Sequence, residues 1–279
     1  MDKENQFTII ENGELITCIS DSTEITIPEE VNSIREGGLD DTAFKGCENL
    51  TSVIIPGSVK TIGRGAFSDL IKLTNVKLEE GITSIGHFAF ENCDKISKVE
   101  IPSSVTFIGA DAFSIPTIVH MPKGNETCFE QDGCILGNGG KSLIRICEDV
   151  EEITVPSSVV SVEPYAFLGC KKLKKVILPE NLESIGGSAF CVCKNLENIS
   201  IPETVTFIGE EAFAGCEKLE SIIIPPNVTN IESLAFEECV NLKSVVVSNP
   251  ATKISNSAFD DCSDYLKIVN KNGEEIEFS

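Results

Sequence analysis

The sequence predicts a solenoid, a stack of similar units with a parallel β-sheet on its concave side and turns and short helical segments on its convex side. Three observations lead to this fold class. The dipeptide Ala-Phe recurs nine times along the 279 residues. Two alternating apolar residues followed by proline precede most of these copies, and an apolar V-x-x-I pattern lies between the proline and the Ala-Phe pair.

The spacing of the Ala-Phe copies sets the size of the unit. Successive phenylalanines are 23 positions apart, except for the 54 positions between Phe113 and Phe167. The clearest copy begins at Leu219 and carries L-x-x-I-x-I at its start. A 23-residue unit of this pattern falls within the range of leucine-rich repeats, so we predict a leucine-rich-repeat solenoid with the phenylalanines in its interior.

Each unit begins with a predicted strand. Pairs such as Val53 and Ile55, or Ile222 and Ile224, alternate with other residues, which is typical of a strand with one buried face. A proline then follows in most units and ends the strand, because proline has no N–H for the next hydrogen bond. Eleven strands are expected, centred near Thr26, Ile54, Lys77, Glu100, His120, Thr154, Ile177, Ser200, Ile223, Val246 and Val269.

We expect residues 1–279 to form a single solenoid with two arrays of repeats. Asn12-Gly13 and Asn272-Gly273 are typical turns of hairpins that would cap the two ends. The irregular stretch with CFEQDGCILGNGGKSLIRI interrupts the period and predicts a further hairpin. The expected parts are a first array with its cap at 1–122, the hairpin insertion at 123–150, a second array at 151–264 and a C-terminal cap at 265–279.

Composition and charge exclude several classes of partner. The formal charge is −22, from 44 acidic and 22 basic residues, so a nucleic-acid backbone would be repelled. No apolar run is long enough to cross a membrane as a helix, and we expect no membrane insertion. We expect a monomer with a well-solvated surface.

No catalytic, cofactor or metal site is predicted. The two histidines, His87 and His120, have no evident acid or nucleophile partner. Gly139-Gly140-Lys141-Ser142 lacks the earlier glycine of a phosphate-binding loop, because position 135 is Ile, and it is better explained as a hairpin turn.

Twelve cysteines are present, and the repeat determines the place of most of them. Buried free cysteine packs as a small apolar residue, so we predict a column of reduced thiols. Metal binding is the alternative, but no C-x-x-C pair completes a zinc set beside Cys191 and Cys193. Seven cysteines follow the repeat phenylalanine by three positions: Cys47, Cys93, Cys170, Cys193, Cys216, Cys239 and Cys262.

The full motif I-P-x-x-V-x-x-I-G-x-x-A-F-x-G-C, nearly complete from Ile201 to Cys216, resembles the BspA-like leucine-rich repeats of bacteria and some protists. The resemblance covers most of residues 22–264. It implies a non-enzymatic adhesion or host-interaction protein that binds a protein or glycan and is secreted or lies at the cell surface. The opening residues MDKENQFTII do not have the pattern of a signal peptide, and reduced cysteines fit a cytoplasmic protein as the alternative location.

The outward face of the strands is the candidate binding surface. Residues between the two buried members of each strand point outward, and several of them are apolar. A structural spacer or scaffold segment with no specific ligand is the alternative function, and it would favour charged residues or threonine at these positions. The candidate partner-binding residues are Ile177, Ser200, Ile223, Val246 and Ile54.

Overall fold

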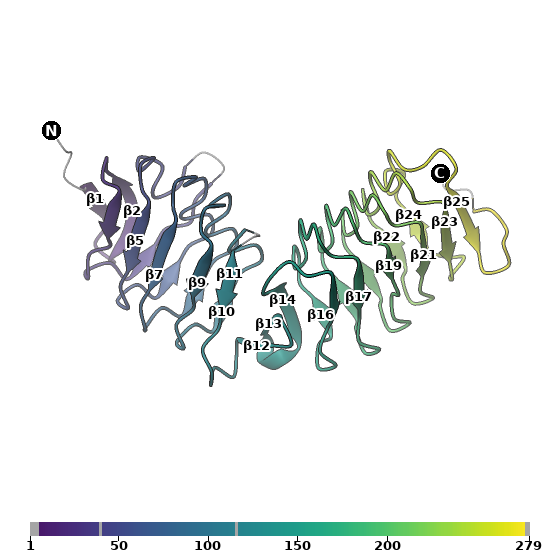
Figure 1. The fold of residues 1–279 in the computed structure, drawn as a ribbon, viewed down its shortest axis with the longest axis horizontal. Helices are drawn as coiled ribbons and strands as arrows, with labels where there is room; N and C mark the ends of the chain where they lie inside the picture. The colour runs from purple at the N-terminus through teal and green to yellow at the C-terminus, as the bar shows by residue number, and fades with distance from the viewer. Residues whose placement is uncertain (1–5, 39–40, 115–116, 277–279) are drawn as a thin grey trace. The chain divides into compact units, whose positions relative to one another are not determined.

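The computed structural model describes residues 6–38, 41–114 and 117–276, which fall into two compact units (Figure 1). Unit 1 comprises residues 1–130 and 135–139, and unit 2 comprises residues 131–134 and 140–279. Each unit is a stack of parallel strands, so the predicted solenoid class is confirmed. The continuity of the whole chain as one solenoid, with the boundaries given above, stays a prediction.

The first side of each repeat in unit 1 is formed by the predicted long strands. They are β3 (Glu24–Thr26), β5 (Ser52–Ile55) and β7 (Asn75–Leu78) in one parallel sheet, and β9 (Lys98–Glu100) with β11 (Ile118–His120) in another. Val53 and Val76 lie in register and are buried, while the residues beside them face outward. The alternation read from the sequence therefore assigns the inner face of these strands correctly.

A second parallel sheet forms the next side of each repeat, and the sequence analysis did not foresee it. Each V-x-x-I segment ends in a two-residue strand: β4 (Ser33–Ile34), β6 (Thr61–Ile62), β8 (Ser84–Ile85) and β10 (Phe107–Ile108). The isoleucines point inward, as expected. A strand of two residues is too short to show a periodic pattern, which is why the sequence marks only its buried members.

The N-terminal hairpin belongs to this second sheet. Strand β1 (Gln6–Ile9) pairs antiparallel with β2 (Glu14–Ile19), and β2 pairs parallel with β4. Gly13 supplies the positive φ of 80° that the turn requires. The hairpin therefore covers the edge of the first two-residue strand of unit 1.

Unit 2 repeats the arrangement with the same two sides. Its long strands are β15 (Glu152–Thr154), β17 (Lys175–Ile177), β19 (Asn198–Ile199), β21 (Ser221–Ile224), β23 (Ser244–Val247) and β25 (Lys267–Asn270). Its second side contains β14 (Ser142–Ile146), β16 (Ser161–Val162), β18 (Ser184–Ile185), β20 (Phe207–Ile208), β22 (Asn230–Ile231) and β24 (Lys253–Ile254). The insertion preceding β14 holds β12 (Phe129–Gln131), β13 (Cys134–Gly137) and the 3₁₀ segment η1 (Asn138–Gly140).

The predicted strand centres agree with the structure at all but one position. Ser200 lies one residue beyond the end of β19, while the other ten centres lie inside strands. At the C-terminus the chain reverses at Asn272-Gly273, where the N–H of Asn270 donates to the carbonyl of Glu274 at 2.9 Å. Residues 277–279 of the predicted C-terminal cap and residues 1–5 lie outside the described residues.

The interior of each unit is a column of stacked phenyl rings, here called the phenylalanine column. In unit 2 it runs through Phe167, Phe190, Phe213, Phe236 and Phe259, and in unit 1 through Phe44, Phe67, Phe90 and Phe113. Neighbouring ring centroids lie 4.2 Å apart for Phe44 and Phe67 and 5.3 Å apart for Phe213 and Phe236. The spacing follows the repeat distance of the sheets, so one residue type at one repeat position produces a continuous core.

The third side of each repeat consists of turns, and in the described ranges it contains none of the short helical segments expected there, since η1 belongs to the insertion. In most repeats the residues two positions before and after the column phenylalanine have positive φ, as at Phe88 (57°) and Asn92 (57°) around Phe90. A left-handed residue on each side of the phenylalanine prevents a right-handed helix. Instead, successive repeats are linked by backbone bonds such as that from the Phe190 N–H to the Ala212 carbonyl at 2.8 Å.

The glycine that follows V-x-x-I is required by close approach between repeats. A Cβ on Gly209 would lie 2.4 Å from the backbone nitrogen of Gly187 in the preceding repeat. Gly209 does not have a positive φ, so glycine is required here because a side chain would not fit and not because of the backbone conformation.

Candidate functional site

The predicted binding strip lies on the outer face of the long strands of unit 2. Ile177 and Ile223 are 46% and 62% exposed, which is unusual for large aliphatic side chains on a charged surface. Ser200 is exposed, and Val246, the register partner of Ile223, is half-buried. Unit 2 therefore places these four residues in neighbouring repeats on one face.

Ile54, the fifth predicted residue, belongs to unit 1 and has a different setting. It is half-buried in β5 and pairs with Thr26 and Lys77 on its two sides. With polar residues as its neighbours in the sheet, Ile54 does not form an apolar strip of its own.

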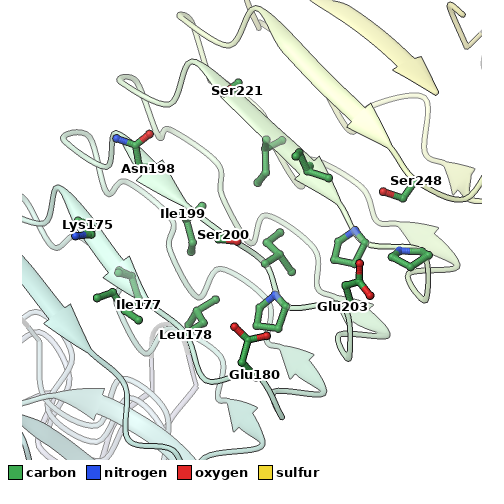
Figure 2. A pocket seen from close by; sticks show the side chains of 17 residues that line it. Lys175, Ile177, Leu178, Glu180, Asn198, Ile199, Ser200, Glu203, Ser221 and Ser248 are labelled. Carbon is green, nitrogen blue, oxygen red and sulfur yellow. The ribbon is translucent and has the colours of Figure 1, made fainter. Parts of the chain in front are cut away.

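A shallow pocket of about 640 Å³ opens over β17, β19 and β21 (Figure 2). Ile177, Ser200 and Ile223, at the same position of three successive repeats, all line it. The small serine between the two isoleucines leaves room for the hollow. Strand β19 has only two residues, and the sheet that contains β17 ends with it. The pocket thus forms where one sheet of the face stops and the next begins.

Polar residues border the pocket at both ends of its strands. Lys175, Asn198 and Ser221 line it at the beginning of the three strands. Glu180 and Glu203 line it beyond their ends, beside the prolines at the corner (Figure 2). The result is an aliphatic floor with a polar border.

Lysines on the long strands and beside them pair with glutamates one repeat away. Lys175, which lines the pocket, has its Nζ 3.9 Å from the Oε2 of Glu152. The Nζ of Lys174 lies 2.9 Å from the Oε2 of Glu151, and the Nζ of Lys243 lies 3.3 Å from the Oε1 of Glu220. The Lys174 ammonium lowers the pKa of Glu151, chiefly through this hydrogen bond. Both members of each pair are well exposed, so these pairs contribute little to stability.

Glu180 and Glu203 are different, because no ion pair within the described part of the chain involves either carboxylate. Both side chains are exposed. The pocket therefore combines apolar surface with uncompensated negative charge on one border.

The thiols of the cysteine column contact backbone carbonyls of the phenylalanine column, and most of them are buried packing groups. The Cys193 thiol lies 3.0 Å from the carbonyl oxygen of Phe167, and the Cys216 thiol lies 3.3 Å from that of Phe190. Burial raises the pKa of the Cys93 thiol to about 12 and that of Cys191 to about 11. A raised pKa keeps these groups as thiols, which are poor nucleophiles and poor metal ligands. Within the described ranges no group of three or more metal-ligating side chains forms.

We predict that the protein prepared under reducing conditions contains twelve free thiols, because the repeat fixes most cysteines as packing residues. Alkylation after denaturation without reductant, followed by intact mass measurement, should add twelve labels. A mass with fewer than ten labels would contradict the prediction.

The two histidines do not form a catalytic arrangement. The Nδ1 of His87 accepts a hydrogen bond from the Ala110 N–H at 2.9 Å, and its ring lies edge-on to Phe107 with centroids 5.7 Å apart. His120 is exposed at the end of β11. Among the described residues, the hydrogen bonds and ring contacts of His87 involve no carboxylate.

Two further surface features were missed by the sequence analysis. Phe107 and Phe207 are 45% and 47% exposed on the second side, where other repeats have a small polar residue such as Ser184. The shared segment V-T-F-I-G at 105–109 and 205–209 carries this signal. A pocket of about 390 Å³ in unit 1 is lined by Ser68, Leu70 and Ile71 among others, where the sequence departs from the cysteine pattern.

No helix among the described residues is long and apolar enough to cross a membrane.

Comparison with known proteins supports the assignment of the repeat. The family model for the BspA type leucine rich repeat region matches residues 37–127 and 140–265 in six copies. A comparison with curated proteins finds no match.

Among solved structures, similar folds come from bacterial proteins. A leucine rich cell surface protein from Faecalibacterium prausnitzii is 23% identical with a TM-score of 0.63, over 100% of this chain and 98% of that one. A leucine-rich repeat protein from Eubacterium ventriosum is 23% identical with a TM-score of 0.69, over 95% and 82% of the two chains. The pneumococcal vaccine antigen PcpA is 23% identical with a TM-score of 0.68, over 98% and 82%. At this identity the likeness concerns the fold.

Proposed function

Because the chain belongs to the BspA-type leucine-rich repeat family, we propose that it is a non-enzymatic binding protein that engages a protein partner through the long-strand face of unit 2. The observation that carries the proposal is the pocket over β17, β19 and β21 with the exposed Ile177 and Ile223 at its floor. Contiguous exposed apolar surface on an otherwise charged protein is typical of an interaction site. A spacer with no ligand has no need of such a face.

The charges around the pocket indicate the chemistry of the partner. Glu180 and Glu203 contribute negative charge that no described ion pair compensates, while nearby lysines are already paired. A partner segment with an aliphatic side chain next to a lysine or arginine would fill the floor and meet these carboxylates. Complementary charge steers association and disfavours acidic competitors. A protein segment is favoured over a glycan because the two large side chains of the floor, Ile177 and Ile223, are aliphatic.

The test compares the chain with the double variant Ile177→Glu/Ile223→Glu as immobilised bait for proteins of its native environment. We expect the amount of captured partner to fall at least about tenfold, because the double variant would bury two charges at the contact. The thermal midpoint should stay nearly unchanged, since both positions face outward. The captured protein, identified by mass spectrometry, is then titrated against each variant.

The control is Ile71→Glu, which makes the same substitution once, at an isoleucine that is 64% exposed in unit 1. It should leave binding intact, and Glu180→Gln/Glu203→Gln should weaken binding mostly at low salt. Equal binding by the double variant would place the site elsewhere. Binding in a glycan array that the double variant abolishes, with no protein captured, would support the glycan alternative and contradict the protein proposal.

A further inference from the structure

A cysteine takes the place of a phenylalanine at the N-terminal end of the column in unit 1. The N–H of Cys18 in β2 donates to the Ala43 carbonyl at 2.7 Å, as the N–H of Phe67 donates to the Ala89 carbonyl at 2.8 Å. Cys18 thus has the backbone position of a column residue, but its side chain is a thiol. It is 1% exposed.

The cysteine of the first repeat faces this thiol. The Sγ of Cys47 lies 3.3 Å from the carbonyl oxygen of Cys18, just as the Sγ of Cys93 lies 3.1 Å from that of Phe67. Because residue 18 is a cysteine and not a phenylalanine, the two sulfur atoms come to 3.5 Å from one another. The repeat geometry that directs the Cys93 thiol at the carbonyl of Phe67 directs the Cys47 thiol at the carbonyl and the thiol of Cys18.

The backbone brings the two cysteine-bearing segments next to one another. Ile19 and Gly46, next to the two cysteines, form a parallel bridge, so the two segments are direct neighbours. Cys18 lies one residue before this bridge and Cys47 one residue after it, and their sulfur atoms face one another at 3.5 Å. Only a small approach of the sulfur atoms is needed to reach the bond length of about 2.05 Å.

We propose that Cys18 and Cys47 form a covalent modification site that reacts with a low-molecular-weight disulfide, such as oxidised glutathione, to cross-link the N-terminal hairpin to the first repeat. The thiolate of Cys47 attacks one sulfur of the oxidant and forms a mixed disulfide, and one glutathione thiolate leaves. The thiolate of Cys18 then attacks the Cys47 sulfur and releases the second glutathione thiolate. Two protein thiols are oxidised to one disulfide. One molecule of oxidised glutathione is reduced to two molecules of glutathione, which take up the protons of both protein thiols.

The contact between the two thiols also decides which of them reacts first. The hydrogen bond with Cys18 lowers the pKa of Cys47, and the same contact with burial raises the pKa of Cys18. Cys93 has no such partner, and burial raises its pKa to about 12. Since the thiolate is the nucleophile, Cys47 is the attacking group. Access for the oxidant comes from opening of the terminal hairpin, where local unfolding costs least.

The cross-link closes a loop between β2 and the first turn of the third side. It prevents the hairpin of β1 and β2 from separating from β4, whose edge the hairpin covers. A disulfide across a loop of this length restricts the unfolded chain substantially. Oxidation is therefore expected to stabilise the N-terminal end of unit 1.

The test treats the reduced full-length protein with oxidised glutathione and then digests it with trypsin without reduction. We expect the peptides 4–35 and 46–60, which contain Cys18 and Cys47 as their only cysteines, to be recovered as one cross-linked species. The alkylation count should fall from twelve to ten, and the thermal midpoint should rise by roughly 5 °C or more.

Cys18→Ala should abolish both the cross-link and the rise in midpoint, whereas the matched variant Cys93→Ala should keep both. The peptide mapping uses the unsubstituted chain, so it decides the question even where a variant fails to fold. Recovery of the two peptides without a cross-link after oxidation, or a cross-link that leaves the midpoint unchanged, would overturn the proposal.

Discussion

Phe190→Ala is expected to lower the free energy of unfolding by about 3–5 kcal/mol, the range for removing a fully buried ring. Phe190 is 0% exposed and stacks on both sides, with ring centroids 4.6 Å from Phe167 and 5.2 Å from Phe213. Truncation leaves a cavity in the middle of the column, and the rigid spacing of the sheets prevents the neighbouring rings from closing it. Denaturant unfolding of the full chain measures the effect.

Phe207→Ala is the matched control, because it removes the same atoms from an exposed ring in the same unit. Phe207 is 47% exposed in β20, and its loss should cost less than about 1 kcal/mol. An intermediate value is expected for Phe259, which stacks on Phe236 but is only half-buried. Equal losses for Phe190→Ala and Phe207→Ala would show that the column does not carry the stability of unit 2.

The sequence was sufficient to predict the solenoid class and the inner face of the long strands. A strict period of 23 residues means that position i lies beside position i + 23, as for Glu151 with Lys174 and Ile223 with Val246. Alternation within a strand then separates the buried Ile222 from the exposed Ile223. Both rules depend on local spacing, which a single sequence shows directly.

The features that the sequence did not predict depend on where repeats meet or on backbone conformation. The second sheet consists mostly of two-residue strands, which have no period of their own. Left-handed residues such as Phe88 and Val192 are not glycines, so their positive φ has no compositional signal. The pocket arises from a small Ser200 between two isoleucines together with the short β19, and neither fact alone predicts a hollow.

The contact between the Cys18 and Cys47 thiols could not be predicted from the sequence either. Cys18 lies outside the cysteine positions of the repeat, and Cys47 precedes the next column cysteine, Cys93, by two repeats. Only the pairing of Ile19 with Gly46 shows that the hairpin continues the stack and brings the two thiols together.

Removal of residues 265–279 is expected to cause aggregation or loss of cooperative unfolding. This deletion takes away β25, whose four residues pair with β23 from Ser244 to Val247. Val245 and Val247 are buried at 0% and 1% exposure, and their strand would become a free edge next to uncovered apolar surface. Exposed edges of this kind pair with other chains, and terminal repeats of solenoids need a capping element.

A chain that ends at Asn270 is the control for this deletion. It keeps β25 and loses the final reversal, in which the Ile276 N–H donates to the Ile268 carbonyl at 2.9 Å. We expect this chain to remain monomeric and to unfold cooperatively, with a moderately lower thermal midpoint, because β23 stays paired. Light scattering and thermal unfolding at several protein concentrations separate the two variants. A chain ending at residue 264 that stays monomeric with an unchanged midpoint would mean that β23 needs no cover and that β25 does not cap the stack.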